Sequence, residues 1–297
     1  MKKNIVVTGA AGFLGSYFIK MLNTKKYNVY AIDRKRFTFK GIIPIVTDIK
    51  NINNFQDKLP EKIDYLYHFA AIKDISVCEK NYEKTYFNNT YLTLKLLFEL
   101  KHRIKTFIFT SSCAVYGENK VPTKEEYQPL PLSFYALSKL AAENYCLLFS
   151  RLWKINTIVL RLFNLYGKWY KKDVYQGVII KFINRIEKGK AITIYGDGKQ
   201  FRDFISVSDV CKILLIFLKK LPQQIILNIG TGKKIEIIKL CSLLQKVLNK
   251  KVERYHTKPR QFEIYHSLAD NKKLLKFLDN NFSFCSFESG ISDLLIK

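Results

Sequence analysis

The chain has 297 residues and is strongly basic, with 50 Lys and Arg against 25 Asp and Glu and a formal net charge of +25. A hydrophobic content of 48% is ample for a core, and the apolar segments are too short and too interrupted to span a bilayer. Six cysteines without Cys-x-x-Cys spacing and four scattered histidines indicate free thiols and no metal site.

The positive charge could serve nucleic acid or an anionic membrane surface. The lysines are spread along the whole chain, however, and a lysine-rich genome would produce the same composition. A basic protein also suits a substrate that carries a diphosphate. We expect no nucleic-acid partner and no membrane insertion. The first strand is predicted almost at Met1, which leaves no room for a signal peptide, so we expect a cytoplasmic protein.

The chain opens with a strand near 4–8, a glycine-rich turn and a helix near 13–24. The turn contains Gly9, Gly12 and Gly15. The first glycine allows the tight turn, the second lets the backbone approach a pyrophosphate, and the third lets the helix pack on the strand. Because the positive end of the helix dipole then faces the phosphates, this segment predicts a dinucleotide site.

The second predicted strand, near 28–33, ends in Asp33, 18 residues after Gly15. A carboxylate here can bind the ribose hydroxyls of adenosine and would repel a 2′-phosphate, which favours NAD over NADP. Arg34, Lys35 and Arg36 follow directly and could accept that phosphate, so the preference for NAD is not absolute.

Further strands and helices alternate along the chain, and this alternation predicts an α/β fold, a Rossmann doubly wound parallel sheet. After residue 165 the sequence becomes polar and aromatic, with turn signals around a short strand at 191–195. We therefore expect an NAD-binding domain over 1–165 plus about 203–232, and a smaller interleaved C-terminal substrate domain over about 166–202 plus 233–297. The further strands lie near 42–47, 64–70, 106–111, 157–163 and 225–229; the helices lie near 81–102, 133–152, 174–188, 207–220, 235–248 and 270–278.

Ser112, Tyr135 and Lys139 are the predicted catalytic residues. Tyr135 and Lys139 are four residues apart and share one helix face, so the ammonium favours the phenolate and lowers the pKa of the tyrosine. Ser112 could hold the substrate hydroxyl whose proton the tyrosine takes. Such a group suits proton transfer coupled to hydride transfer at an alcohol carbon.

Taken together, these motifs resemble the extended short-chain dehydrogenase/reductase family, and more narrowly its NAD-dependent nucleotide-sugar epimerase/dehydratase branch, including the UDP-galactose 4-epimerases. The resemblance covers nearly the whole chain and implies two sets of binding residues. For the cofactor it implies Gly9, Gly12, Phe13, Leu14, Gly15, Asp33, Arg34, Asp48, Ile49, Phe69, Ala70, Ala71, Lys73, Asn89, Tyr135, Lys139 and Phe163. For a nucleotide-diphosphate sugar it implies Ser112, Asn164, Val178, Thr193, Tyr195, Arg202 and Arg260.

Within this resemblance, Arg202 and Arg260 would clamp the diphosphate, Asn164 would hydrogen-bond it, and Tyr195 could stack on the base or belong to the core. His68 is interpreted as a packed strand-end residue rather than a catalytic one.

The chain departs from the 4,6-dehydratases of this branch, which carry Asp-Glu where it has Cys113 and Ala114. Without that acid and base, elimination of water is not expected. Cys113 is similar to the Ser-Ser-Cys segment of GDP-fucose synthase-type enzymes, but no histidine follows Asn164 in the segment 165–174. We interpret Cys113 as a small strand-end residue.

These observations favour an NAD-dependent nucleotide-sugar 4-epimerase that acts through a transient 4-keto intermediate. A 4-ketoreductase or C4 dehydrogenase with exchangeable NAD(P)(H) would use the same three residues and stays open. A non-catalytic NAD-binding or nucleic-acid-binding protein is a second alternative. By the same resemblance we expect a homodimer through the helices near 81–102 and 133–152, where Leu92, Leu96, Leu140 and Leu147 could serve the dimer face or the monomer core.

Overall fold

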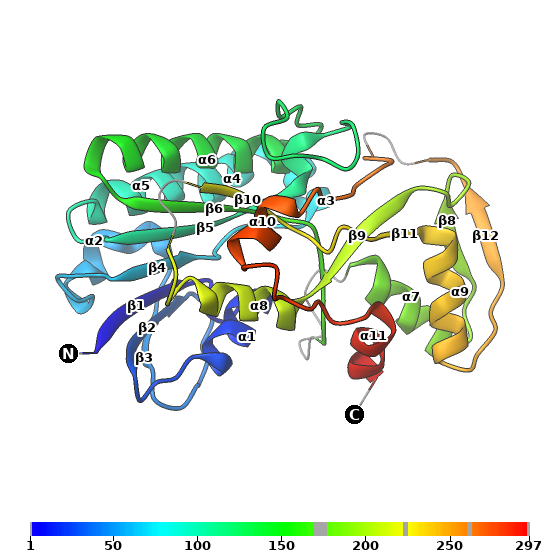
Figure 1. The fold of residues 1–297 in the computed structure, drawn as a ribbon, viewed down its shortest axis with the longest axis horizontal. Helices are drawn as coiled ribbons and strands as arrows, with labels where there is room; N and C mark the ends of the chain where they lie inside the picture. The colour runs from blue at the N-terminus through cyan, green and yellow to red at the C-terminus, as the bar shows by residue number, and fades with distance from the viewer. Residues whose placement is uncertain (1, 169–176, 222–224, 260–262, 296–297) are drawn as a thin grey trace. The chain divides into compact units, whose positions relative to one another are not determined.

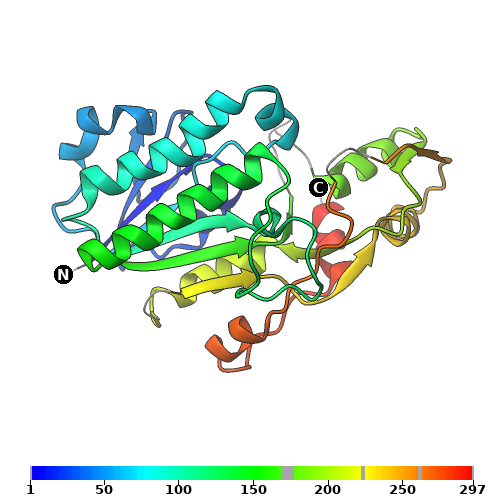
Figure 2. The ribbon, with the colours of Figure 1, turned by 90° about the horizontal axis from the view of Figure 1, so that it is seen from above.

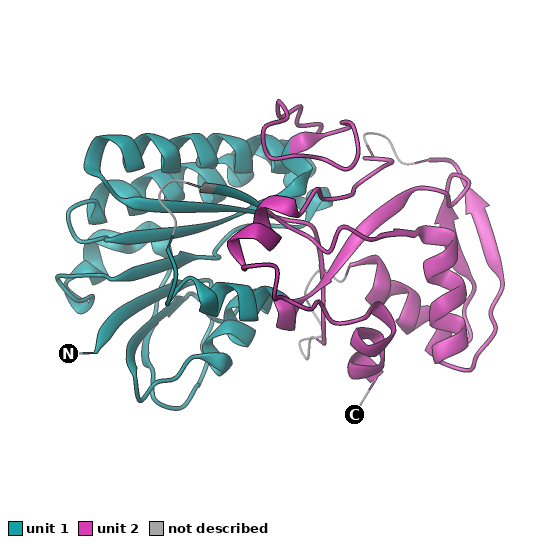
Figure 3. Cartoon of the chain, in the orientation of Figure 1, with its two compact units in different colours: residues 1–115, 133–161, 210–227 teal, residues 116–132, 162–209, 228–297 magenta. Residues whose placement is uncertain are grey.

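The computed structural model describes residues 2–168, 177–221, 225–259 and 263–295. The chain forms two compact units (Figure 3), each interleaved in sequence. Unit 1 comprises Met1–Val115, Ser133–Arg161 and Val210–Leu227, and unit 2 comprises Tyr116–Leu132, Leu162–Asp209 and Asn228–Lys297. Four segments that the sequence assigned to the first domain lie in unit 2 instead: 116–132, 162–165, 203–209 and 228–232. The assignment of ligands to two domains stays a prediction.

A seven-stranded sheet organises unit 1, in the order β10-β6-β5-β4-β1-β2-β3 (Figure 1). Its central pairs are parallel, with Ile5 opposite both Val29 of β2 and Tyr65 of β4. The predicted strands are confirmed to within one or two residues at most ends. The strands are β1 (Lys3–Thr8), β2 (Tyr27–Asp33), β3 (Ile43–Val46), β4 (Tyr65–His68), β5 (Thr106–Ser112), β6 (Asn156–Leu162) and β10 (Ile225–Ile229).

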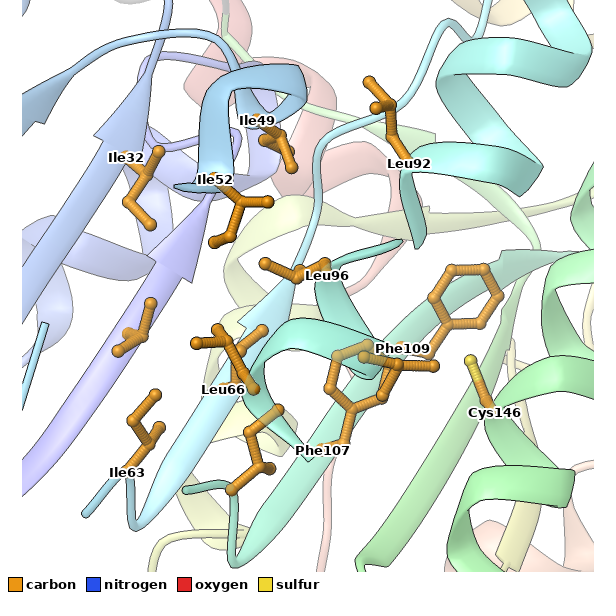
Figure 4. Packing of buried hydrophobic residues seen from close by; sticks show 14 of the residues in the cluster. Ile32, Ile49, Ile52, Ile63, Leu66, Leu92, Leu96, Phe107, Phe109 and Cys146 are labelled. Carbon is orange, nitrogen blue, oxygen red and sulfur yellow. The ribbon is translucent and has the colours of Figure 1, made fainter. Parts of the chain in front are cut away.

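Helices cover both faces of this sheet (Figures 1 and 2). The core on one face joins the strands to α2, α5 and α6 (Figure 4). On the other face, Phe18 of α1 packs against Tyr67 of β4, whose hydroxyl donates to the carbonyl of Leu214 in α8 at 2.9 Å. Because the strands are buried on both faces, they are continuously apolar. The helices and helical turns are α1 (Phe13–Met21), η1 (Ile49–Asn51), α2 (Ile52–Phe55), η2 (Gln56–Lys58), α3 (Ile75–Lys80), α4 (Tyr82–Tyr86), η3 (Phe87–Tyr91), α5 (Leu92–Leu100), η4 (Cys113–Tyr116), α6 (Phe134–Trp153) and α8 (Val207–Ile216).

The prediction of a single helix near 81–102 is wrong in one respect, because a π-helical turn, η3, separates α4 from α5. Asn89 lies in this wide turn with only 1% of its surface exposed. Its side-chain carbonyl accepts from the backbone N–H of Ile72, and its amide donates to the carbonyl of Ile72 and to Ser138 Oγ. π-Turns of this kind occur frequently at functional sites.

The four leucines that could serve the dimer face or the monomer core differ in their burial. Leu92 and Leu96 are buried in the core, with 3% and 0% exposed, whereas Leu140 and Leu147 are half-buried. Large apolar side chains nevertheless remain exposed on the same helices, including Tyr82, Tyr86, Phe87 and Leu137. No helix among the described residues is long and apolar enough to cross a membrane.

Unit 2 contains two small sheets, with strand orders β11-β9-β7 and β12-β8. Its core is built from α7, α9, α11 and the strands beside them. Only β8 was predicted among these strands. β7, β11 and β12 have only three or four residues, and β9 carries the charged pair Arg202 and Asp203. The elements are β7 (Asn164–Tyr166), α7 (Val178–Glu187), β8 (Ile192–Tyr195), β9 (Phe201–Ser206), β11 (Lys234–Glu236), α9 (Ile237–Val247), β12 (Arg254–Thr257), α10 (Lys272–Phe277) and α11 (Phe287–Leu295).

Candidate active site

The glycine-rich turn joins β1 to α1 at the carboxyl end of the sheet. Gly9 has φ +71°, and a Cβ there would lie 2.7 Å from the backbone nitrogen of Ala70. A Cβ on Gly15 would lie 2.2 Å from the carbonyl oxygen of Gly9. The N-cap residue of α1, Gly12, provides no side chain to cap the first turn, which carries Phe13 and Leu14. This open helix N-terminus fits a pyrophosphate, because it offers backbone donors at the positive end of the dipole.

Asp33, at the end of β2, lies beside this turn. Its Oδ2 accepts from the backbone N–H of Ala11 at 3.0 Å, and its Oδ1 accepts from that of Lys35 at 2.9 Å. The carboxylate is thus held in place while each oxygen keeps further acceptor capacity for ribose hydroxyls. Arg34 follows it and is exposed.

The other predicted cofactor residues of unit 1 lie on neighbouring loops at this edge. Asp48 caps η1 by accepting from the N–H of Lys50, and Ile49 belongs to the core. Phe69, Ala70 and Ala71 follow β4, where the first two approach the backbone of the glycine turn.

Two contacts hold the loop that follows Ala71. The ammonium of Lys73 lies 5.3 Å from the ring centroid of Phe13, and Asn89 fixes Ile72 through both backbone groups. The structure therefore brings the cofactor residues predicted in unit 1 to one end of its sheet.

His68 is a core residue, in agreement with its interpretation from the sequence. Its Nδ1 lies 2.7 Å from Thr8 Oγ1 and its Nε2 lies 3.0 Å from Thr93 Oγ1, and only 1% of the residue is exposed. Burial, assisted by the nearby ammonium of Lys139, lowers the pKa of His68 to about 3. The imidazole is therefore neutral and ties the start of the glycine turn to α5.

The three predicted catalytic residues lie on two neighbouring elements. Ser112 ends β5, and Tyr135 and Lys139 occupy the first two turns of α6. Lys139 is 97% buried, and its ammonium lies 4.2 Å from the ring centroid of Phe109, three residues before Ser112 on the same strand. Burial lowers the pKa of Lys139 to about 8, although Cys146 and Glu143 act in the opposite direction.

Ser112 and Tyr135 are both partly exposed, as reacting groups must be. Ser112 Oγ accepts from the backbone N–H of Ala114 at 3.2 Å, which leaves its hydroxyl proton available to a ligand. Ser133 caps α6 by accepting from the N–H of Ala136 at 3.1 Å. This cap fixes the helix start on which Tyr135 depends.

Glu143 was missed in the sequence, although it continues the spacing of Tyr135 and Lys139 by four more residues. It forms a buried ion pair with Arg161 of β6, in which Nη2 lies 2.8 Å from Oε2 and Nε lies 3.1 Å from Oε1. The side chains are 1% and 4% exposed. The pair locks α6 to the sheet one turn after Lys139. The spacing places Glu143 on the same helix face as Lys139, but only the fold reveals Arg161 as its partner.

The predicted substrate residues fall mainly in unit 2. Phe163, which was predicted to bind the cofactor, also lies in unit 2; it is buried and donates its backbone N–H to the carbonyl of Ile229. Asn164 donates from its side chain to the carbonyl of Asp203 at 3.3 Å, beside Arg202. The guanidinium of Arg202 pairs with Glu263 at 2.9 Å and also donates to the carbonyl of Tyr265. Glu263 was not predicted as a partner of Arg202.

The remaining substrate residues are less closely grouped. Val178 begins α7, and Thr193 and Tyr195 lie on β8, all half-buried. Arg260 lies outside the described residues, so its predicted place in a diphosphate clamp stays a prediction. Within the described parts of the chain, no group of His, Cys, Asp and Glu side chains has the arrangement of a metal site.

Asp203 of β9 is fully buried and was not predicted as a site residue. Its carboxylate accepts from the N–H and hydroxyl of Thr231, at 2.9 and 2.7 Å, and from the N–H groups of Gly232 and Ala269. Burial raises the pKa of Asp203, while these donors oppose the rise. Asp203 therefore ties β9, which carries Arg202, to two distant loops.

The parallel sheet, the glycine turn and the buried lysine one helical turn after a tyrosine define a Rossmann-type dinucleotide-binding enzyme. Residues 5–230 match the NAD dependent epimerase/dehydratase family, and the chain belongs to that family. It is 31% identical over 299 residues to the uncharacterized UDP-glucose epimerase YtcB of Bacillus subtilis, covering 92% of this chain and 91% of the relative.

Two solved structures of 4-epimerases are similar over almost the whole chain. A UDP-N-acetylglucosamine 4-epimerase from Methanobrevibacter ruminantium, in complex with UDP-N-acetylmuramic acid, superposes with a TM-score of 0.90 at 32% identity, covering 99% of this chain and 98% of that one. A UDP-glucuronic acid 4-epimerase from Bacillus cereus, in complex with UDP-glucuronic acid and NAD, gives 0.87 at 29% identity, covering 98% and 97%.

Proposed function

We propose that this enzyme is an NAD-dependent nucleotide-sugar 4-epimerase that acts through a transient 4-keto intermediate. The observation that carries the proposal is the buried ammonium of Lys139, one helical turn after Tyr135 and beside the strand that ends in Ser112. The similarity to 4-epimerases that bind UDP-sugars supports the choice of reaction.

Tyr135 would act as the base that removes the proton of the C4 hydroxyl and later returns it. With a pKa of about 8, Lys139 is about nine-tenths charged at pH 7, and this charge stabilises the phenolate of Tyr135. Ser112 would hold the C4 oxygen by donating its hydroxyl proton, since its oxygen already accepts from Ala114. NAD, when bound, supplies the hydride acceptor and donor for C4.

The chain's residues also favour NAD over NADP. The carboxylate of Asp33 is held at the end of β2 by the N–H groups of Ala11 and Lys35. A fixed negative charge in this place repels a 2′-phosphate and accepts hydrogen bonds from ribose hydroxyls. Arg34, Lys35 and Arg36 are exposed beside it and are the feature that would allow NADP.

For the substrate we propose a nucleotide-diphosphate sugar held by Asn164, Arg202 and Arg260, with Val178, Thr193 and Tyr195 around the nucleotide. Arg202 pairs with Glu263, so a diphosphate must compete with this carboxylate. Charge-assisted bonds to the non-reacting diphosphate would leave the sugar free to turn over.

A 4-ketoreductase or C4 dehydrogenase is the second candidate, because hydride chemistry at C4 needs the same three residues. Dehydration is disfavoured, since Cys113 and Ala114 stand where an acid and a base would be needed. The two candidates differ in what happens to the cofactor, which an epimerase regenerates in every turnover.

We also propose that the enzyme forms a homodimer through α4, η3 and α6. Tyr82, Tyr86 and Phe134 are 56%, 57% and 46% exposed there, and Leu137 is 52% exposed. Large apolar groups gathered in this way are typical of an interface. Light scattering should give twice the mass of one chain for the wild type, and the mass of a single chain for Tyr86→Glu.

A screen of UDP-, GDP-, CDP- and dTDP-sugars by NMR tests the function. The purified enzyme is first given each sugar without added cofactor and then with NAD(P)H. We expect one class to convert to its C4 epimer without added cofactor. Turnover only with stoichiometric NAD(P)H, with unchanged epimer ratios, would assign the reductase instead.

A further inference from the structure

Lysines that are scattered along the sequence gather at one edge of unit 1, the amino-terminal edge at which the parallel strands begin. In Figure 1 this is the side where the N-terminus is marked. The loops entering β1, β2 and β3 meet there, since Lys2 Nζ lies 3.5 Å from the carbonyl of Thr24 and a Cβ on Gly41 would contact Thr24 at 2.5 Å. Their exposed lysines are Lys2, Lys3, Lys25, Lys26 and Lys40.

The loops entering the other strands continue this basic edge. Lys62, Lys105 and Lys154 are exposed directly before β4, β5 and β6. The backbone of Lys105 bonds to Ile63 at 2.8 Å and to Asn156 at 3.0 Å, so these three loops are neighbours. Beyond them, the hydroxyl of Tyr65 donates to the carbonyl of Leu218, directly before the exposed pair Lys219 and Lys220.

Acidic side chains do not balance this edge. Within the described loops that enter the strands, the acids are Asp57, Glu61 and Asp64, and Asp64 already accepts from the N–H of Asn4 at 2.9 Å. At the opposite edge, where β2, β3 and β4 end, seven bases face five acids, so the excess of bases is smaller; the bases are Arg34, Lys35, Arg36, Lys50, Lys73, Lys80 and Lys84. The acids there are Asp33, Asp48, Asp74, Glu79 and Glu83. The excess of basic over acidic side chains is therefore larger at the amino-terminal edge, where ten exposed lysines face three acids.

Exposed apolar side chains lie among these lysines, because α1, α5 and α6 all end at this edge. Leu152 is 60%, Phe98 53% and Met21 38% exposed. The ammonium of Lys101 lies 3.6 Å from the ring centroid of Phe98. Surfaces that bind the interface of an anionic bilayer typically combine basic side chains with single apolar side chains between them.

We propose that this basic edge of unit 1 is a peripheral docking surface for an anionic lipid bilayer. A membrane fits better than a nucleic acid, because lysine acts as a point charge on lipid headgroups, whereas nucleic-acid recognition favours the fork of arginine. The guanidinium of Arg103, at the same edge, is bonded to the carbonyls of Gln56, Leu59 and Pro60. The glycine turn and Tyr135 lie at the other end of the sheet, so docking would not cover them.

The test compares two variants of equal charge. The edge variant replaces Lys25, Lys26, Lys62 and Lys105 by Gln. The control replaces Lys246, Lys251, Lys272 and Lys276, four exposed lysines of unit 2, by Gln. Binding is measured by co-sedimentation with phosphatidylcholine vesicles that contain about one third phosphatidylserine, and with pure phosphatidylcholine vesicles.

We expect the wild-type chain to bind only the phosphatidylserine vesicles and to be released at about 0.5 M salt. Since each basic residue contributes about fivefold near an anionic surface, the edge variant should bind about 100-fold or more weakly, and the control should change by less than about fivefold. Absence of binding by the wild type, or equal losses in both variants, would overturn the proposal. A single-stranded RNA that binds more tightly than vesicles, and is lost with the same four lysines, would instead assign a nucleic-acid surface.

Discussion

The ion pair of Glu143 and Arg161 allows a quantitative test of how α6 is held. Both side chains are at most 4% exposed and share three hydrogen bonds. Replacing Glu143 by Ala leaves a buried guanidinium without its counter-charge, which typically costs about 3–5 kcal/mol. Because a domain has about 5–15 kcal/mol of stability in total, we expect Glu143→Ala to lower the free energy of unfolding by about that 3–5 kcal/mol.

The control keeps the volume and removes both charges. Glu143→Met combined with Arg161→Met should restore most of the lost stability, since apolar replacements of buried ion pairs are often neutral. Urea unfolding followed by circular dichroism measures both variants and the wild type. A loss of less than about 1 kcal/mol for Glu143→Ala, or a double variant as unstable as the single one, would refute the reasoning.

The same residue predicts a change in the pH dependence of activity. The charge of Glu143 raises the pKa of Lys139 against the stronger effect of burial. Glu143→Gln should therefore lower the pKa of Lys139 further. Because activity needs the charged ammonium of Lys139, the loss of activity on the alkaline side should then begin at a lower pH. An unchanged alkaline limb would show that Glu143 acts on stability alone.

Two further predictions concern the glycine turn and the buried histidine. Gly9→Ala should weaken NAD binding and lower the free energy of unfolding by more than about 1 kcal/mol, because Gly9 has φ +71° and its Cβ would meet the backbone of Ala70. The control is Gly177→Ala, whose Cβ meets nothing within 4 Å. In thermal-shift titrations with NAD, the control should change neither stability nor NAD binding. The pKa of His68 is lowered to about 3, so below about pH 6.5 the unfolded chain binds a proton that the folded chain does not, and stability should fall by about 1.4 kcal/mol per pH unit. Stability is measured as the urea midpoint at several pH values. This dependence of stability on pH should be lost in His68→Gln and kept in the control His102→Gln, a change at an exposed residue. An equal dependence on pH in both variants would contradict the low pKa of His68.

The sheet of unit 1 could be predicted because its strands are continuously apolar. Ile5, Val6 and Val7 are all fully buried, and this pattern marks a central parallel strand whatever its neighbours are. By contrast, β7, β11 and β12 have only three or four residues and partly exposed patterns. Such strands depend on pairing across the chain, and a local pattern does not carry that information.

The candidate site also has features that the sequence could predict and features that it could not. The glycine turn and the Tyr135–Lys139 spacing are local and could be recognised directly. The pairs Glu143–Arg161 and Arg202–Glu263 join residues 18 and 61 positions apart, so only the fold reveals them. The π-turn at Asn89 was missed because its sequence continues the helical pattern on both sides.

The central claim is that the hydride removed from C4 returns to the same sugar. The enzyme is incubated, without added cofactor, with the nucleotide sugar that the NMR screen identifies, labelled with deuterium at C4, and this label is followed by NMR. We predict that the label appears at C4 of both the substrate and its C4 epimer with no loss of the total, and that Tyr135→Phe slows this exchange by about 10²–10⁴-fold. Loss of deuterium from the sugar, or its appearance only in a released reduced cofactor, would contradict an epimerase and assign net oxidation.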